Sequence, residues 1–342
     1  WPAIFNTGHQ IVFAHTSFKW TNLASNNAGV TVAIVGISST PQPVKRLFSV
    51  SEDGSVQERQ VDYINAYLVP GRVNSVEQER RPISSVSPML FGNMPRDGGA
   101  FVLDGEERAR VLMQHPELER FVRPYMGSEQ MIQGKPRWCL WIEDDDAPYA
   151  QQHPYLKTVL DQVRDFRLSS AASSTRDFAG RPHRFVQIAG TAKQHSLVVA
   201  KVSSERRPYL PVDLLDGSVI VSDLLFALYD APLWNLAVLA SRLHLVWIAT
   251  VCGKMKTDFR YSNTIGWNTF PLPKLTEKNI DDLTRCAQEI LLARERHYPQ
   301  TLAELYAPDA MPTDLLRAHE RNDEVVERIY IEIGRASCRE RV

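Results

Sequence analysis

Two short segments of the sequence combine basic side chains with hydroxyls or an aromatic ring. The first is Ser203-Ser-Glu-Arg-Arg207, and the second is Lys254-Met-Lys-Thr-Asp-Phe-Arg-Tyr261. Arginine forks suit phosphates and guanine edges, and serine hydroxyls suit phosphates. The candidate DNA-binding residues are therefore Ser203, Ser204, Arg206, Arg207, Lys254, Lys256, Arg260 and Tyr261. A solvated face or a set of ion pairs is the alternative, because Glu205 and Asp258 lie inside the two segments.

An acidic run, Glu143-Asp-Asp-Asp146, has the carboxylates that could chelate a divalent cation. A metal-dependent nuclease is the corresponding hypothesis, and a solvated turn after a strand is the alternative. The histidines form no HExxH motif and no zinc pattern with the cysteines. No loop of the kind that cradles nucleotide phosphates or S-adenosylmethionine is visible in the sequence. We therefore expect no metal site and no catalytic residue in this chain.

The charge balance restricts where nucleic acid can bind. The 342 residues include 39 Lys and Arg against 40 Asp and Glu, for a net charge of −1. A protein that coats nucleic acid without sequence preference is usually strongly basic, so any DNA-binding surface here is expected to be a local patch. Apart from Cys338 in the segment 332–342, which is set aside below, the cysteines are Cys139, Cys252 and Cys286. These scattered residues form no disulfide framework, and no signal peptide is visible, which suits a reducing cytoplasm.

Hydrophobic patterning predicts a mixed α/β fold in the first half of the chain. The runs 11–14 and 30–36 predict strands buried on both faces, joined by a loop over 15–29. The Ser- and Pro-containing stretch 38–54 predicts a linker or an excursion from the sheet. Helical spacing within 154–178 places Leu156, Val159, Leu160, Val163 and Phe166 on one buried face. Further strands are predicted at 101–103, 137–142, 197–200 and 218–222, and a further helix at 106–114.

The second half is predicted to be more helical. Residues 233–251 form the most apolar stretch, but Arg242 and His244 interrupt it, which indicates one buried core helix rather than a membrane span. Thr276 is the expected cap of a following helix, and a last helix is expected over 312–329.

Five groups of segments, in order along the chain, together resemble one protein family. They are Phe13-Ala-His-Thr-Ser-Phe-Lys-Trp20 with Asn26-Asn-Ala-Gly-Val-Thr-Val-Ala-Ile-Val-Gly36, then Phe91-Gly-Asn-Met-Pro-Arg-Asp-Gly-Gly99, Arg123-Pro-Tyr-Met-Gly-Ser128 with Arg137-Trp-Cys-Leu-Trp141, the segment 202–211, and the three pieces 241–247, 252–262 and 268–271. The first resembles the last two strands of the methyltransferase domain of MmeI-like (type IIL) restriction–modification enzymes. The others resemble their target-recognition domain. Enzymes of this family fuse a nuclease, an adenine methyltransferase and a target-recognition part in one chain.

The resemblance implies a role at a flipped adenine. In related adenine methyltransferases an aromatic residue of the loop after the first of these strands stacks on the extruded base, which has lost its stacking in the duplex. By position Phe18 is the first candidate and Trp20 the second, whereas the alternative is that both rings pack beneath the loop. Base–aromatic stacking contributes about 1–3 kcal/mol. The implied partner is double-stranded DNA, and the implied methyl donor is S-adenosylmethionine.

The resemblance also implies a domain organisation. We expect strands of a methyltransferase domain over 1–45, a target-recognition domain over 60–274 and a helical segment over 275–331. Residues 332–342 resemble a translated sequencing adapter and are set aside. The family's cofactor loop and Asn-Pro-Pro-Tyr motif precede this region and do not occur here, so a C-terminal fragment without catalytic residues is expected. A stand-alone DNA-specificity module is the alternative, although the strands over 11–36 would then have unpaired edges.

Overall fold

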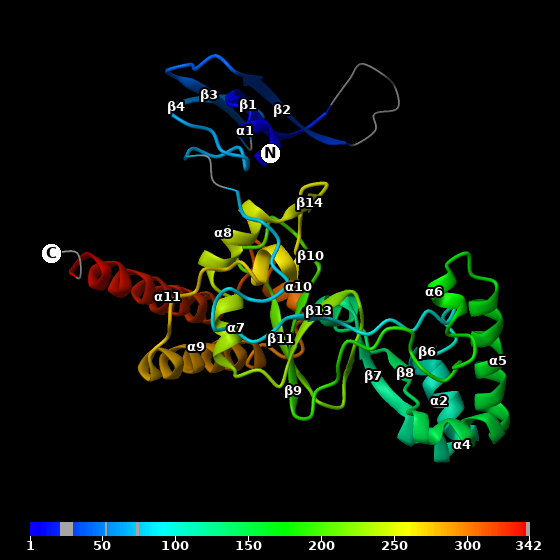
Figure 1. The fold of residues 1–342 in the computed structure, drawn as a ribbon. Coiled ribbons are helices and arrows are strands. Elements are labelled where there is room, and N and C mark those ends of the chain that lie inside the picture. The colour runs from blue at the N-terminus through cyan, green and yellow to red at the C-terminus, as the bar shows by residue number, and fades with distance from the viewer. Residues whose placement is uncertain (21–29, 52, 73–74, 340–342) are drawn as a thin grey trace.

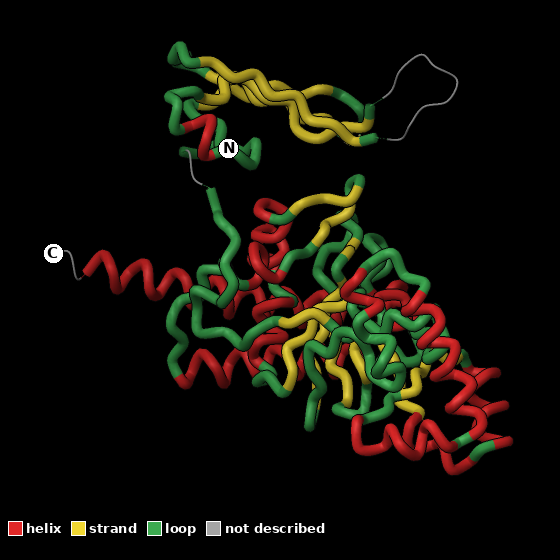
Figure 2. The backbone as a smooth tube through the Cα atoms, turned by 45° about the vertical axis from the view of Figure 1, so that its right-hand side comes forward, coloured by secondary structure: helices red, strands yellow, loops and turns green. Residues whose placement is uncertain are grey.

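The computed structural model consists of an N-terminal sheet, a central body and a lobe beside that body (Figures 1 and 2). It describes residues 1–20, 30–51, 53–72 and 75–339, with side chains up to residue 332. The sheets formed by these residues are mostly antiparallel, and helices are interspersed among their strands. The mixed α/β class expected from the sequence is therefore confirmed. Of the described helices, none combines the length and the apolar character needed to span a membrane.

The N-terminal sheet has the strand order β2-β1-β3-β4, with β1 antiparallel to β2 and parallel to β3. Its elements are α1 (Pro2–Phe5), β1 (Gln10–Lys19), β2 (Thr31–Ser38), β3 (Lys45–Val50) and β4 (Val56–Val61). A small core formed by Ile11, Ala14, Leu47 and Ile64 holds these elements together.

Two expectations for the N-terminal sheet are wrong. The stretch 38–54 is not a linker, because β3 occupies its second half and pairs with both β1 and β4. The predicted loop over 15–29 begins late, because β1 continues through Lys19 and Phe18 pairs with Val32 of β2. Strand pairing thus overrides the turn-forming residues of both segments.

A third expectation for this sheet, burial on both faces, is also wrong. Phe13 is 41% exposed and Ile34 is 44% exposed. The described part of the chain covers only the side chains that point into the small core, so the apolar residues that alternate with them remain open to solvent.

The lobe contains a sheet of order β12-β7-β8-β6 with helices packed around it. Its elements are β6 (Val102–Leu103), α2 (Gly105–Gln114), the 3-10 turn η1 (Pro116–Phe121), β7 (Val122–Met126), α3 (Ser128–Gln133), β8 (Trp138–Leu140), the 3-10 turn η2 (Asp144–Asp146), α4 (Ala147–Gln152), α5 (Pro154–Leu168), α6 (Ser173–Arg176) and β12 (Ile220–Val221). Helix α2 begins with a capping box, in which Asp104 and Glu107 each accept the other's backbone N–H. The lobe's core includes Phe101, Leu118, Phe121 and Leu140.

Helix α5 buries a face that includes a charged residue. Leu156, Val159, Leu160 and Val163 are buried as predicted, but Phe166 is 44% exposed. The neighbouring Arg167, by contrast, is 0% exposed. Its guanidinium donates five hydrogen bonds of 2.6–3.1 Å to backbone carbonyls of Pro95, Arg96, Phe178, Arg181 and Arg184. Burial lowers the pKa of Arg167 to about 10, which leaves it charged at neutral pH.

The central body is built on an antiparallel sheet of order β11-β9-β13-β5. The strands are β5 (Leu90–Phe91), β9 (His195–Ala200), β11 (Val212–Asp216) and β13 (Leu225–Tyr229). A smaller sheet comprises β10 (Val202–Ser203), β14 (Gly253–Met255) and β15 (Asp258–Arg260), and the helices are α7 (Trp234–Leu239), α8 (Arg242–Val251), the π-helical turn η3 (Asn263–Trp267), α9 (Glu277–Glu295), α10 (Leu302–Leu305) and α11 (Thr313–Arg339). β9 and β13 read as almost continuous apolar runs because both of their faces are covered.

The apolar stretch 233–251 forms two helices rather than the single helix predicted. Ser241 interrupts it with an extended backbone and caps α8, since its Oγ accepts the backbone N–H of His244 at 3.1 Å. The same hydroxyl donates to the carbonyl of Val238 at the end of α7, over 2.7 Å. A serine that satisfies both helix ends makes the break possible inside the core.

The C-terminal helices share the core of the central body. Leu283 and Ile290 of α9 and Val326 and Ile329 of α11 belong to the same buried cluster as the central strands. The expected cap is confirmed, because the side chain of Thr276 accepts the backbone N–H of Asn279 over 3.2 Å. These helices therefore support the sheet from which the candidate site projects.

Candidate nucleic-acid interface

The small sheet of order β10-β15-β14 brings the two basic segments of the sequence together. Val202 pairs with Arg260 and Ser203 with Phe259, so the first segment lies directly against the second. The ammonium of Lys254 also lies 3.2 Å from the carboxylate of Glu205. One of the two acidic residues inside the segments thus links them.

The strands β14 and β15 form a hairpin whose tip carries a lysine. Met255 pairs with Asp258, which leaves Lys256 and Thr257 as a two-residue turn. Lys256 has a φ of 59°, in the left-handed region that tight hairpins require and that glycine or asparagine usually occupies. A strained non-glycine residue at an exposed tip is a common sign of a functional position.

Most of the predicted basic residues point into solvent. Arg206, Lys254, Lys256 and Arg260 are exposed. Arg207 is half-buried, and its Nη1 donates to the Ser203 hydroxyl over 3.3 Å. Burial lowers the pKa of Arg207, and nearby Asp258 offsets part of that shift. Arg207 therefore braces the end of β10, and Arg206 lies in the turn that follows this strand.

Two of the predicted residues lie inside the protein. Ser203 and Tyr261 are each 4% exposed. The Tyr261 hydroxyl lies 2.9 Å from Nε2 of His244, and burial raises the pKa of Tyr261 well above its usual value. Burial also lowers the pKa of His244 to about 3, so this pair is neutral at physiological pH. This placement does not support direct contact of Ser203 or Tyr261 with DNA. Ser204, by contrast, is only half-buried.

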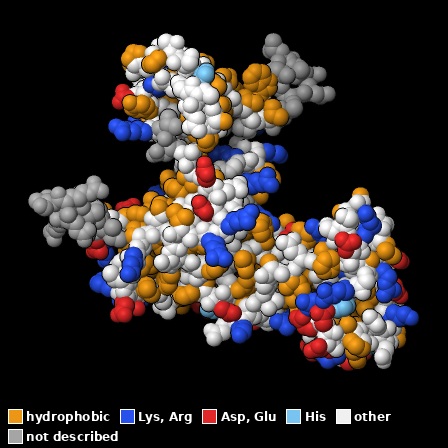
Figure 3. All heavy atoms as spheres, in the orientation of Figure 1, with side chains coloured by type: hydrophobic (Ala, Val, Ile, Leu, Met, Phe, Trp, Pro, Cys, Tyr) orange, Lys and Arg blue, Asp and Glu red, His pale blue; other side chains and the backbone are white. Residues whose placement is uncertain are grey.

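The assembled surface is strongly positive although the chain is not. Segments 201–207 and 253–260 together carry six basic and two acidic residues, a local charge of +4 in a chain with a net charge of −1. Figures 1 and 2 show the β14–β15 hairpin on the side of the body that faces the N-terminal sheet. Lys and Arg side chains gather on this part of the body in Figure 3. Such a local concentration attracts phosphates.

Sequence reasoning missed Lys201, which borders the same sheet. Its backbone carbonyl accepts the N–H of Tyr261 over 2.8 Å, and its ammonium lies 4.4 Å from the centre of the Phe91 ring. Burial lowers the pKa of Lys201. Its position two residues before the first basic segment could have indicated it in the sequence.

The predicted base-stacking residues lie at the end of β1. The Phe18 ring is half-buried and packs 4.8 Å from the His15 ring, measured between centroids. Trp20 is 45% exposed, its ring lies 6.4 Å from that of Phe18, and its backbone N–H donates to the carbonyl of Val30. Both rings thus have accessible surface, and they adjoin one another. The rest of the predicted loop, residues 21–29, lies outside the described residues.

The Phe91–Gly99 segment acts in the fold. Asn93 is fully buried and donates to the carbonyls of Gly190 and Val221, while its Oδ1 accepts the backbone N–H of Ala189. A Cβ at Gly92 would collide with the backbone carbonyl of Ser222. This segment therefore joins the lobe to the central body.

Carboxylates of the acidic run form ion pairs with basic neighbours. Asp144 accepts hydrogen bonds from His183 at 2.8 Å and Arg181 at 2.9 Å, and these contacts lower the pKa of Asp144 to about 2. Glu143 pairs with Arg184, and Asp146 pairs with Arg120. With three of its carboxylates held in ion pairs, the run offers little support for a metal-dependent nuclease.

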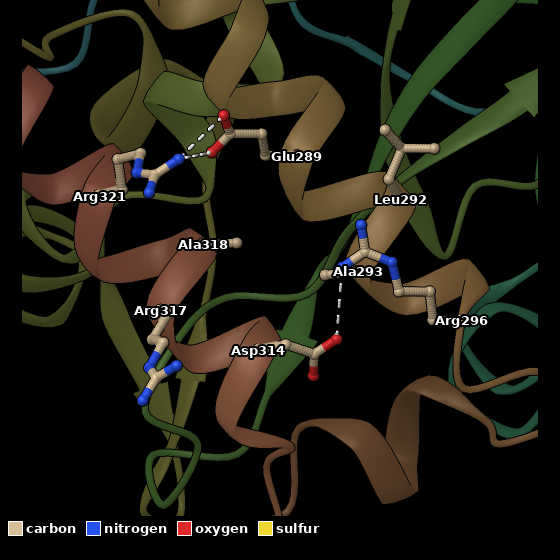
Figure 4. Close-up of a pocket in the computed structure, with 8 residues that line it drawn as sticks. All are labelled: Glu289, Leu292, Ala293, Arg296, Asp314, Arg317, Ala318 and Arg321. Carbon is tan, nitrogen blue, oxygen red and sulfur yellow. Dashed lines mark hydrogen bonds and ion pairs between the residues drawn. The ribbon is translucent and has the colours of Figure 1, made fainter.

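A groove of about 320 Å³ lies between α9 and α11 (Figure 4). Arg296, Arg317 and Arg321 line it together with Glu289 and Asp314. Arg321 lies 3.0 Å from Glu289, and Arg296 lies 3.7 Å from Asp314. These ion pairs compensate much of the positive charge, so the groove is a weaker anion site than the hairpin.

Three family models match the chain in sequence order. They are the MmeI DNA-methyltransferase domain over residues 1–49, the MmeI target recognition domain over 70–274 and the MmeI C-terminal domain over 275–342. The last match and helix α11 both extend into the residues that the adapter interpretation sets aside.

Two known proteins resemble the chain over almost its whole length. DNA methyltransferase A of Bacillus subtilis (strain 168) is 37% identical over 330 residues, which are 96% of this chain and 37% of that protein. A structure of the type IIL restriction–modification enzyme MmeI in complex with DNA matches with a TM-score of 0.91 and 32% identity, over 96% of this chain and 44% of that one. The chain thus spans less than half the length of either relative.

Proposed function

Because this chain belongs to the MmeI family, we propose that it reads a short sequence in double-stranded DNA and positions an adenine for N6-methylation. The β10-β15-β14 sheet carries this proposal, since it and the residues next to its strands bring together six basic residues in a chain whose charges otherwise nearly cancel. Arg206, Lys256 and Arg260 are exposed and can reach base edges or phosphates, and Lys254 adds an exposed ammonium that Glu205 partly neutralises.

The division of labour follows from which domains the chain matches. Residues 1–49 match only part of a DNA-methyltransferase domain, so we assign methyl transfer to a complete domain of that kind and recognition to this chain. S-adenosylmethionine would supply the methyl group, and we assign none of the described residues to its binding. In this arrangement residues 1–45 carry the aromatic residues that hold the flipped base. Residues 60–274 recognise the DNA sequence, and residues 275–331 support this recognition domain.

The recognition proposal is tested by selection from a randomised duplex library. The chain is expected to enrich one short sequence, whereas recovery of unrelated duplexes would contradict sequence recognition. We predict that Arg206→Ala weakens binding to the selected duplex by about 1–3 kcal/mol if the guanidinium reads a base. Competition binding at several salt concentrations measures the change. An Arg206→Ala protein with unchanged affinity and salt dependence would remove this residue from the interface.

We also predict that Phe18→Ala slows methylation in an enzyme that joins this chain to a complete methyltransferase domain. Losing one base–ring stack costs about 1–3 kcal/mol, or roughly 5- to 150-fold in rate if the stack forms in the transition state. Single-turnover methylation of the selected duplex measures the rate, and Phe18→Trp serves as the conservative variant that retains a stacking face. If Phe18→Ala and Phe18→Trp methylate as fast as the parent, Phe18 does not hold the base.

A further inference from the structure

Two histidines and a glutamate converge at one corner of the lobe. His115 follows α2, Glu117 lies in the first turn of η1, and His153 precedes α5. Each offers a ligand atom, and the three atoms lie within 4.8 Å of one another. Nε2 of His153 is 2.8 Å and Nδ1 of His115 is 3.6 Å from the same carboxylate oxygen of Glu117. The histidines lie too far apart in sequence for a motif search to find them.

These distances resemble those between the ligands of a tetrahedral metal ion. Zinc bonds of about 2.0–2.1 Å at tetrahedral angles place neighbouring ligand atoms about 3.3 Å apart. The two distances to Glu117 lie on either side of that value. The side chain of Glu117 is 47% exposed, so it has room to move by the few tenths of an ångström that separate its two distances from that value.

We propose that His115, Glu117 and His153 form a zinc-binding site with an open fourth position for water. Two imidazoles and one carboxylate suit Zn²⁺, and harder ions such as Mg²⁺ prefer oxygen ligands. The exposed side of Glu117 leaves room for the water.

Zinc binding displaces two existing contacts. One is the 2.8 Å hydrogen bond between Nε2 of His153 and Glu117, in which the metal takes the place of the shared proton. The other holds the start of α5. His153 caps α5, because its Nδ1 accepts the backbone N–H of Leu156 over 3.5 Å. Coordination through Nε2 places the ring proton on Nδ1, so this hydrogen bond is lost. The bond is already at the limit of hydrogen-bond length, so its loss is a small penalty beside two metal–nitrogen bonds and one metal–oxygen bond.

The site would act on structure rather than on DNA. It ties the corner between α2 and η1 to the start of α5, two segments that pack on the same lobe core. Figure 1 places these helices in the lobe, away from the β14–β15 hairpin. The inference therefore does not depend on the proposed function.

Isothermal titration of the full chain with Zn²⁺, using protein purified without a polyhistidine tag, tests the site. We expect one saturable site, a higher melting temperature in the presence of Zn²⁺, and the visible absorption bands of tetrahedral Co²⁺ when cobalt replaces zinc. His115→Ala is expected to weaken zinc binding at least tenfold, roughly the lower end of effects seen at metal sites. His153→Ser should do the same while it keeps an acceptor at the cap of α5.

His297→Gln is the matched control. His297 also pairs with a carboxylate, that of Asp314 at 2.7 Å, but it belongs to no three-ligand group among the described residues. Zinc affinity is expected to remain unchanged in this variant. Equal binding by the parent and the His115→Ala and His153→Ser proteins, or no saturable binding by the parent, would overturn the proposal.

Discussion

Replacement of Arg167 by methionine is expected to lower the free energy of unfolding by about 3 kcal/mol. The methionine fills much of the same space but donates none of the five hydrogen bonds that the guanidinium makes. The carbonyls of Pro95, Phe178 and Arg181 still accept a backbone N–H. Among the described residues no other donor reaches the carbonyls of Arg96 and Arg184, and each buried unsatisfied group costs about 1–3 kcal/mol. Relief from burying a charge offsets part of this loss, which keeps the expected total near the lower end.

Urea unfolding measures the change, and Arg164→Met is the control on the same helix. Arg164 pairs only with Asp161 among the described residues, and its side chain is 42% exposed, so its loss should change stability by less than about 0.5 kcal/mol. Arg167→Lys is expected to recover only a minority of the stability, because an ammonium cannot donate to five spread carbonyls. If Arg167→Met and Arg164→Met unfold at the same urea concentration, the carbonyl cluster is not a structural anchor.

Replacement of Lys254, Lys256 and Arg260 together by glutamine is expected to weaken DNA binding roughly a hundredfold at moderate salt. Each phosphate contact contributes about 0.9 to the slope of log affinity against log salt concentration, so the slope should fall by up to about 2.7. The effect is expected to be large because these residues lie on one hairpin and would contact the same stretch of the DNA phosphate backbone.

Equilibrium binding over a salt series measures both quantities. The matched control replaces Arg110, Lys135 and Arg164 of the lobe by glutamine, since these exposed residues carry the same total charge. The control should retain the slope of the parent. Equal losses in the two triple variants would show that net charge, and not the hairpin, governs binding.

Local patterns were sufficient for much of the fold. The Thr276 cap, the apolar face of α5 up to Val163 and the core strand β9 all follow from neighbouring residues, and the structure confirms them. The prediction for the segment 38–54 was wrong because a strand can form from a turn-rich sequence when neighbouring strands pair with it. The prediction of one helix over 233–251 was wrong because hydropathy does not show that the hydroxyl of a serine can hydrogen-bond the backbone at two helix ends.

For the candidate site too, some features follow from the sequence and others only from the tertiary structure. The sequence by itself determined the family, the mixed α/β class and the two basic segments, because residue type and spacing record them directly. Only the tertiary structure decided that the segments share one sheet, that Tyr261 lies in the core while Arg206 faces solvent, and that His115, Glu117 and His153 meet. These outcomes depend on pairing and packing between residues far apart in the chain, and no local pattern encodes them. Arg167 is the clearest case: its charge predicts exposure, and five carbonyls from other segments bury it.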